Sequence, residues 1–317
     1  MAYTDNFDVS ALSGYVQENK FDLLGRSILS TELSKNITLK PGLQGDVAKI
    51  TLMDDDFQVG AQSCGWNPTG ETSLTQVTMN LFHAEFSHSY CLKDLRSTWM
   101  AETLRPGAQA GMESLPYEQV YAEYFVKSLK KYNEKYLIQG ETGYPGIQAQ
   151  LVGATAGSDY PVVVGENNGK KWVSGTAGAN EVNAFTGAMK LFEKMPFELA
   201  LRDDLILVVN QSDFKALVVA LVEKNLYHYT GSVEKIVVPG TNITVIPTSG
   251  IIQETDGQNF RFLTAGNNII LGTDLMSDHE SFDIWYSQDN REVRAAMAWT
   301  IGVAVVEPNM VVAENFA

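Results

Sequence analysis

The sequence has little positive charge, few cysteines and no long apolar run. Its 317 residues contain 23 Lys+Arg against 38 Asp+Glu, a net charge of −15, whereas a dedicated nucleic-acid reader usually carries a basic stripe. Two cysteines, Cys64 and Cys91, exclude a disulfide framework and a four-thiolate zinc site. No apolar stretch approaches the roughly 20 residues that span a bilayer, and the acidic start lacks the parts of a secretory signal. We therefore expect a cytoplasmic chain with free thiols.

The sequence also lacks the motifs of common chemistries. No GxGxxG or GxSxG occurs, and residues 165–171 (GENNGKK) resemble a P-loop only loosely, one residue short and without its Ser or Thr. His83 and His88 lie five residues apart in a predicted strand, so they face opposite sides and cannot share a metal ion. Residues 54–56 (DDD) lack the spaced ligands of a calcium loop. We expect no catalytic, cofactor-binding or metal site, and no enzyme activity.

What the sequence does contain is an ordered mixture of helices and strands. Its length and its 44% of hydrophobic residues predict about two domains with sizeable cores. Residues 1–45 carry short apolar groups between polar residues and end at Pro41-Gly42 and Gly45. Because this segment has too little apolar surface to fold alone, we expect an arm that lies over another surface.

Residues 46–92 predict a long hairpin. Apolar and polar side chains alternate over residues 47–52, a Gly-rich polar loop follows, and a second extended run comes after it. In that second run the apolar face changes between Leu81 and Phe82. Because a slip of one residue swaps the faces of a strand, this indicates a bulge or a change of pairing partner there.

The strongest helix signal covers residues 113–139, where apolar and aromatic side chains recur at three- and four-residue spacing. Gly140 stands where a C-terminal glycine cap belongs. Glutamates lie early and lysines late, an order that complements the helix dipole. The late lysines are Lys127, Lys130, Lys131 and Lys135.

The remaining segments alternate in type and predict an α+β fold. Residues 141–178 are Gly-rich and predict a loop with one short strand. A buried strand over 205–209 precedes the N-cap candidates Asn210–Asp213. Further helices are predicted over 181–194 and 214–225, short strands at 243–246, 260–263, 269–271 and 282–286, and a long strand over 293–305. The long helix and the long strand have comparable lengths, so we expect them to pack along each other.

This order of segments resembles the major capsid proteins of tailed bacteriophages. Residues 115–140 (LPYEQVYAEYFVKSLKKYNEKYLIQG) look like the spine helix of that family, and the strand and helix in 203–229 look like a segment of its axial domain. Residues 238–248 look like the short strands that follow, and residues 291–312 (REVRAAMAWTIGVAVVEPNMVV) look like the final strand. The resemblance covers nearly the whole chain.

The resemblance implies a fold with four parts. Residues 1–45 would form the N-terminal arm and 46–92 the extended hairpin loop. Residues 93–142 and 290–317 would form the peripheral domain with its spine helix, and 143–289 the axial domain. The implied function is that of a major capsid protein, which assembles through pentamers and hexamers into the icosahedral shell around phage double-stranded DNA.

The implied partners are other copies of the chain, a separate scaffold, a portal, decoration proteins and packaged DNA that is contacted non-specifically, with no membrane. The shell would be assembled in the host cytoplasm and found in the virion. Basic residues near the arm, from Lys20 to Lys49, are candidates for contacts with the genome or a scaffold, although an ordinary solvated arm fits equally well. The apolar residues expected at subunit interfaces are Phe57 and Trp66 of the hairpin loop and Phe7, Phe21 and Leu24 of the arm.

Two departures from the family pattern carry expectations of their own. Some members weld their shells with a Lys–Asn isopeptide bond from the extended loop, and residues 54–75 contain no Lys, so we expect no such cross-link. Some members carry a fused N-terminal scaffold, and the arm has no helical extension, so we expect a separate scaffold or none. A bond between Cys64 and Cys91 of neighbouring subunits stays an alternative to free thiols.

Two other functions also fit the sequence, and a third fits it less well. An encapsulin-type compartment has the same fold and encloses a cargo enzyme in place of DNA. An acidic soluble hydrolase or sugar-binding protein would be a monomer or small oligomer with a closed cleft. A tail tube protein would not need the long helix.

Overall fold

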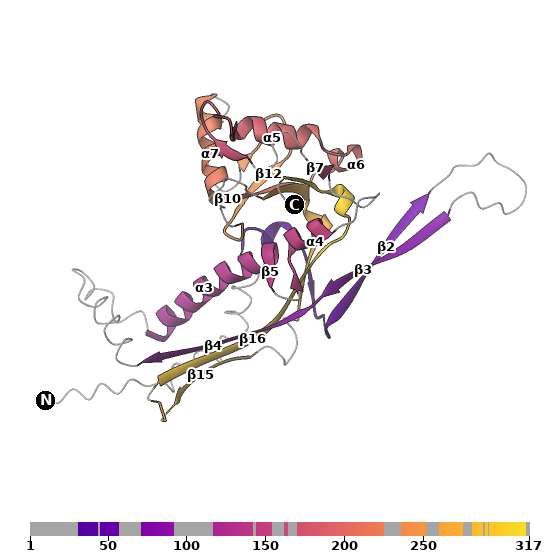
Figure 1. The fold of residues 1–317 in the computed structure, drawn as a ribbon. Helices are drawn as coiled ribbons and strands as arrows, with labels where there is room; N and C mark the ends of the chain where they lie inside the picture. The colour runs from indigo at the N-terminus through magenta and orange to yellow at the C-terminus, as the bar shows by residue number, and fades with distance from the viewer. Residues whose placement is uncertain are drawn as a thin grey trace, which may run out of the picture.

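The computed structural model describes residues 31–43, 45–56, 71–91, 117–141, 144–153, 162–163, 170–224, 236–251, 260–274, 281–287, 289–290 and 292–314. They form two large sheets with their helices, two small strand pairs, and a two-stranded hairpin that projects from one side (Figure 1).

The longest strand, β16 (Glu292–Val305), organises a five-stranded sheet. On one side β16 pairs with β4 (Phe82–Cys91). On its other side it pairs with β15 (Ser281–Ser287) and, further along, with β14 (Ile269–Thr273). The edge strand β1 (Thr38–Pro41) pairs in parallel with β14. The long strand predicted over 293–305 is confirmed.

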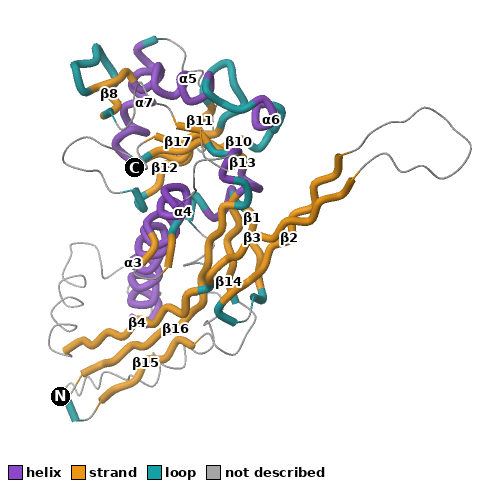
Figure 2. The backbone as a smooth tube through the Cα atoms, turned by 45° about the vertical axis from the view of Figure 1, so that its right-hand side comes forward, coloured by secondary structure: helices purple, strands orange, loops and turns teal. Residues whose placement is uncertain are grey.

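The long helix α3 (Tyr117–Gln139) lies along this sheet, beside β4 and β16 (Figure 2). Its Phe125 meets Phe86 of β4 edge to face, with ring centroids 5.7 Å apart. Leu129 shares one hydrophobic core with Trp299 of β16, so the predicted packing of helix and strand is confirmed. Gly140 follows the helix with φ of 77°, the left-handed conformation that a glycine cap supplies.

The second large sheet has six strands, and together with its helices we call it the six-stranded unit. Its order is β11 (Ile236–Val237), β12 (Thr244–Thr248), β10 (Leu205–Asn210), β13 (Arg261–Ala265), β17 (Val312–Glu314) and β7 (Val162–Val163). Its helices are α5 (Ala184–Glu193), α6 (Phe197–Ala200) and α7 (Gln211–Glu223). All six side chains of β10 are buried, as its apolar run predicts, and the Asn210 side chain caps α7 by accepting a hydrogen bond from the Ser212 amide at 2.6 Å.

The remaining described elements are small. A parallel pair, β8 (Lys171–Val173) and β9 (Glu181–Asn183), precedes α5. The pair β5 (Gly140–Glu141) and β6 (Tyr144–Pro145) leads into α4 (Ile147–Gly153), a helix where the Gly-rich composition predicts a loop. The described residues also contain the 3-10 helices η1 (Ser34–Asn36), η4 (Gly266–Asn268) and η5 (Pro308–Met310).

The projecting hairpin consists of β2 (Val47–Asp56) and β3 (Glu71–Asn80), which pair only with each other among the described strands (Figure 1). After Leu81 the chain continues as β4, which pairs with β16 instead. Of the two alternatives expected between Leu81 and Phe82, a bulge or a change of pairing partner, the structure shows the change of partner. By strand pairing the hairpin spans residues 47–80 and is shorter than the predicted 46–92, because residues 82–91 belong to the five-stranded sheet.

Strand pairing also divides the chain differently from the predicted boundaries at three places. The arm is predicted to reach residue 45, yet β1 is built into the five-stranded sheet and Leu33 is fully buried. Strands β14 and β15 lie within the predicted axial segment, 143–289, but pair with β16. Strand β17 follows β16 in the predicted peripheral segment but joins the six-stranded sheet. The partners of β1 and β17 are distant in sequence, whereas β15 pairs with the strand that follows it directly in the chain.

Candidate functional site

The hairpin formed by β2 and β3 exposes an apolar pair on its distal half. Met53 and Leu74 stand directly opposite each other in the register, and 68% and 66% of their surfaces are exposed. Nearer the body, Ile50 and Met79 are buried in a small core with Leu81. The hairpin is thus anchored at its base and carries uncovered apolar side chains further out. Because a two-stranded hairpin alone is only marginally stable in water, a surface that covers this pair would also stabilise it.

A buried tyrosine, Tyr144, contacts the base of the hairpin. The Tyr144 hydroxyl lies in hydrogen-bonding range of the carbonyl oxygens of Asn80, at the end of β3, and of Ile301 in β16, the latter at 3.0 Å. Its ring lies 5.3 Å from the rings of both Phe82 and Tyr136. Burial raises the pKa of Tyr144 above its ordinary value, so the phenol stays protonated and acts as a donor. The Tyr144 hydroxyl thus lies between the end of β3 and β16, at the point where the hairpin leaves the body.

A second exposed apolar pair lies on the six-stranded unit. Phe197 and Leu201, at the start and just beyond the end of α6, are 78% and 69% exposed, while Leu199 between them is fully buried. On α7, Val219 and Val222 are also exposed. Single apolar residues on the surface are ordinary in soluble proteins. The pair at α6 differs from them because both of its side chains are large and more than two thirds exposed.

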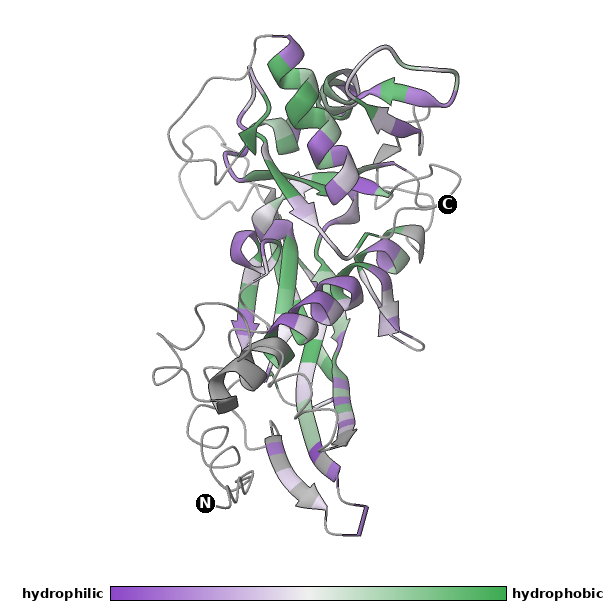
Figure 3. Cartoon of the chain, turned by 90° about the vertical axis from the view of Figure 1, so that its left-hand side faces the viewer, coloured by the Kyte–Doolittle hydropathy of each residue, from purple (hydrophilic) through white to green (hydrophobic). Residues whose placement is uncertain are grey.

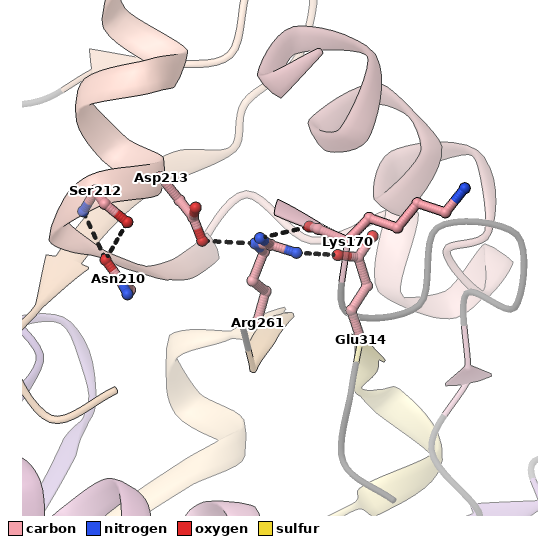
Figure 4. A network of polar contacts seen from close by, with 6 residues as sticks. All are labelled: Lys170, Asn210, Ser212, Asp213, Arg261 and Glu314. Carbon is pink, nitrogen blue, oxygen red and sulfur yellow. Dashed lines mark hydrogen bonds and ion pairs between the residues drawn. The ribbon is translucent and has the colours of Figure 1, made fainter. Parts of the chain in front are cut away.

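A buried ionic network lies inside the six-stranded unit (Figure 4). The Arg261 guanidinium donates from Nε to Asp213 at 2.8 Å, from Nη1 to Glu314 at 2.7 Å and from Nη2 to the Lys170 carbonyl at 2.9 Å. Its Cζ stands 4.6 Å from the centre of the Trp172 ring. The three charged side chains are at most 1% exposed. The network joins β13, α7 and β17 into one unit.

The network carries two carboxylates against one guanidinium. Burial raises the pKa of Glu314 to about 7, although the charge of Arg261 and its hydrogen bond act in the opposite direction. Glu314 Oε1 is buried without a hydrogen-bond partner among the described residues, which agrees with a carboxyl group that holds its proton near neutral pH. Since water and substrates cannot reach these groups, they can stabilise the fold but cannot act on a substrate.

All five predicted interface residues lie outside the described residues, namely Phe7, Phe21, Leu24, Phe57 and Trp66. The loosely P-loop-like residues 165–169, Cys64 and the arm residue Lys20 also lie outside them. Of the other basic residues near the arm, Lys35 is paired with Glu32 at 2.7 Å.

The described residues also show where His83 and His88 lie, and they bear on metal binding and on membrane-spanning helices. His83 accepts or donates a hydrogen bond at 3.0 Å with Thr300 and contacts Asp46 at 3.3 Å, whereas the His88 ring stacks on Phe86. The described part of the chain contains no group of three His, Cys, Asp or Glu side chains that would hold a metal ion. None of its helices is both long and apolar enough to cross a membrane.

Sequence reasoning missed the Arg261 network and the exposed Met53–Leu74 pair. A charged residue at the start of an apolar strand, Arg261 before Phe262 and Leu263, is the one local signal of a buried ion pair. The identity of its partners has no local signal, because Asp213 and Glu314 lie 48 and 53 residues away.

Comparisons with known proteins identify the fold. No family model and no curated protein matches this sequence. Among solved structures, the procapsid of satellite phage P4 with its size determination protein contains a chain that superimposes with a TM-score of 0.59. That match has 10% sequence identity and covers 94% of this chain and 99% of the other.

Two further structures are similar. A chain of Gordonia phage Cozz matches with a TM-score of 0.53 and 12% identity, covering 90% of this chain and 86% of the other. A chain of the SrpI encapsulin complex from Synechococcus elongatus matches with a TM-score of 0.52 and 11% identity, covering 92% and 89%. The chain therefore has the α+β fold of tailed-phage major capsid proteins, as its resemblance implies.

Proposed function

We propose that this protein is a shell-forming subunit, a major capsid protein that assembles through pentamers and hexamers into an icosahedral shell around phage double-stranded DNA. The observation that carries this proposal is the projecting hairpin with its exposed Met53–Leu74 pair. A closed enzyme or binding domain gains nothing from a long two-stranded hairpin with an uncovered apolar pair, which is an aggregation hazard on a monomer. A neighbouring subunit that covers the pair turns this hazard into an assembly contact.

The contact between hairpin and neighbour is heterologous, because the hairpin of one copy lies on a different surface of the next. Heterologous contacts repeat around a ring and close it. We extend the same role to Phe57 and Trp66 in the loop between β2 and β3, and to Phe7, Phe21 and Leu24 in the arm. In this scheme the six-stranded unit is the axial domain, the five-stranded sheet with α3 is the peripheral domain, and the exposed Phe197–Leu201 pair faces a neighbouring axial domain.

An encapsulin-type compartment is the second candidate. The observation that favours it is the match to the encapsulin complex, whose TM-score of 0.52 is close to the 0.53 of the phage structure. The two functions differ in contents, DNA or a cargo enzyme, and the fold serves both. Virion localisation, a scaffold and a portal belong to the first proposal only.

Assembly is tested by negative-stain electron microscopy beside size-exclusion chromatography at two salt concentrations. We expect closed shells, or rings of five and six subunits. Nucleic acid that survives nuclease treatment of shells from the natural source would support DNA enclosure, whereas a co-purifying enzyme would support the compartment. A chain that stays monomeric even with the products of neighbouring genes would contradict both shell functions.

The hairpin contact is tested by the double variant Met53→Ser and Leu74→Ser. Burial of each large apolar side chain stabilises a contact by about 1.5–3 kcal/mol, so losing both should raise the concentration needed for assembly by about a hundredfold or more. The matched control is Thr51→Ser with Gln76→Ser, an exposed pair that is also directly opposed in the same hairpin. Equal assembly by both variants, each with an unchanged circular dichroism spectrum, would contradict the role of the hairpin.

A further inference from the structure

We propose that the outer face of α3 binds the phosphate backbone of duplex DNA through Lys127, Lys131 and Lys135. This inference rests on the proposed shell function, which places DNA inside the assembly. All three lysines are exposed and follow each other at a spacing of four residues, so they line one face of the helix about 6 Å apart. We call this face the lysine stripe.

The composition of this helix face differs from that of the protein. The chain carries a net charge of −15, yet the exposed side chains between Phe125 and Gln139 are only those of lysine, serine and tyrosine, namely Lys127, Ser128, Lys131, Tyr132 and Lys135. In Figure 3, α3 lies in front of the sheet and carries several hydrophilic stretches on the side turned to the viewer. The apolar side chains of the helix face the sheet.

No acidic side chain of this part of the helix offsets the stripe. Glu134 is buried, and its carboxylate accepts hydrogen bonds from the amide, at 3.1 Å, and the hydroxyl of Ser249. Within the described part of the chain, the three lysines of the stripe have no ion-pair partner within 4.0 Å. Like charges at four-residue spacing destabilise a helix slightly, so the stripe is a cost to the isolated subunit.

The helix dipole does not account for these lysines, contrary to the interpretation from sequence. The dipole acts within about the last turn of a helix, and α3 ends at Gln139 with no basic residue in its last turn. Lys127 lies 12 residues before that end. A local feature that costs stability without an internal partner is typical of a binding surface.

The phosphate backbone of duplex DNA matches the stripe in charge and in spacing, and lysines bind it without reading the base sequence. Each strand presents one phosphate per about 3.4 Å of helix axis, so a row of about 12 Å meets three or four phosphates. Lysine is a flexible point charge that follows a backbone without reading bases. The Ser128 and Tyr132 hydroxyls add neutral donors of the kind that also contact phosphates. An acidic protein segment shares the charge but not this regular spacing.

The test measures binding of the full-length subunit to a fluorescent 30-base-pair duplex between 50 and 300 mM salt. The stripe variant is Lys127→Gln, Lys131→Gln and Lys135→Gln. We expect weaker binding and a salt slope, in log K against log salt, that is smaller by about 0.9 for each lost phosphate contact, or about 2.7 for three. The control variant carries Lys171→Gln, Lys194→Gln and Lys215→Gln, three exposed lysines of the six-stranded unit.

Both variants lower the net charge by three, so a general charge effect would weaken them equally, and that result would overturn the proposal. An unchanged stripe variant would overturn it as well. Stripe-dependent binding of poly-L-glutamate without binding of the duplex would assign the face to an acidic protein instead. Electron microscopy of the same samples separates the two proposals. Shells with stripe-independent DNA binding contradict only the stripe, whereas stripe-dependent binding by a chain that forms no shell contradicts only the shell function.

Discussion

Replacing Glu314 with Gln should remove a pH dependence from the stability of the six-stranded unit. The Glu314 carboxyl is fully buried beside Arg261, and its pKa is raised to about 7 from 4.5 in the unfolded chain. Between these two values the unfolded state has lost the proton that the folded state retains. The unfolding free energy of the natural protein therefore falls as pH rises from 4.5 to 7, by roughly 1.4 kcal/mol per pH unit and about 3 kcal/mol in all.

Gln cannot ionise, so the variant does not lose this stability. Near pH 5 the natural carboxyl is protonated in the folded state, and the amide oxygen of Gln can still accept the hydrogen bond from Arg261, so the two proteins should be about equally stable. At pH 8 the variant should be more stable by up to about 3 kcal/mol. The other charged groups that act on Glu314 are Arg261 of β13, Asp213 of α7 and Lys190 of α5, and the substitution leaves all three in place.

The assay is urea unfolding of unassembled subunits at pH 5, 6, 7 and 8, followed by tryptophan fluorescence. Trp172 lies against Arg261 and reports on this region directly. Asp203→Asn, which removes an exposed carboxyl just before β10, serves as the control and should not change the pH profile. A stability difference between Glu314→Gln and the natural protein that is the same at pH 5 and pH 8 would refute the reasoning.

Two further substitutions probe the buried contacts. Arg261→Met leaves two buried carboxyl groups without their cation and should cost about 3–5 kcal/mol in urea unfolding at neutral pH; a loss below about 1 kcal/mol would contradict the network as a stabilising unit. Tyr144→Phe removes the hydroxyl at the base of the hairpin and should lower the unfolding free energy by about 1–3 kcal/mol. The control Tyr132→Phe, at an exposed tyrosine, should leave the unfolding free energy almost unchanged. Equal losses of stability for the two variants would show that the buried hydroxyl has no special role.

Local signals in the sequence predicted much of the fold. Alternation of apolar side chains predicted the hairpin, and its phase change at Leu81–Phe82 predicted a bulge or a change of pairing partner there, because the faces of a strand have a strict period of two. The end of α3 at Gly140 and the cap of α7 by Asn210 follow from backbone groups that must be satisfied at helix ends. The order of these segments was enough to indicate the capsid fold.

Only the tertiary structure decided which distant segments meet. Strand β1 pairs with β14, and β17 joins the six-stranded sheet, although each partner is distant in sequence. In the same way, Arg261 binds Asp213 and Glu314, which lie far from it in the chain. Nothing in local periodicity encodes such partners.

The candidate sites divide in the same way. The expectation that the hairpin docks on a partner came from its composition, since large exposed apolar patches often mark interaction sites, whereas the Met53–Leu74 pair itself required the strand register. The lysines of α3 were visible in the sequence, but the proposal that they bind DNA depended on where the helix ends and which face is exposed. Sequence alone therefore determined the elements and their likeness to a shell protein. Tertiary packing decided how these elements pair and which of their surfaces stay exposed, because burial is a property of contacts between distant segments.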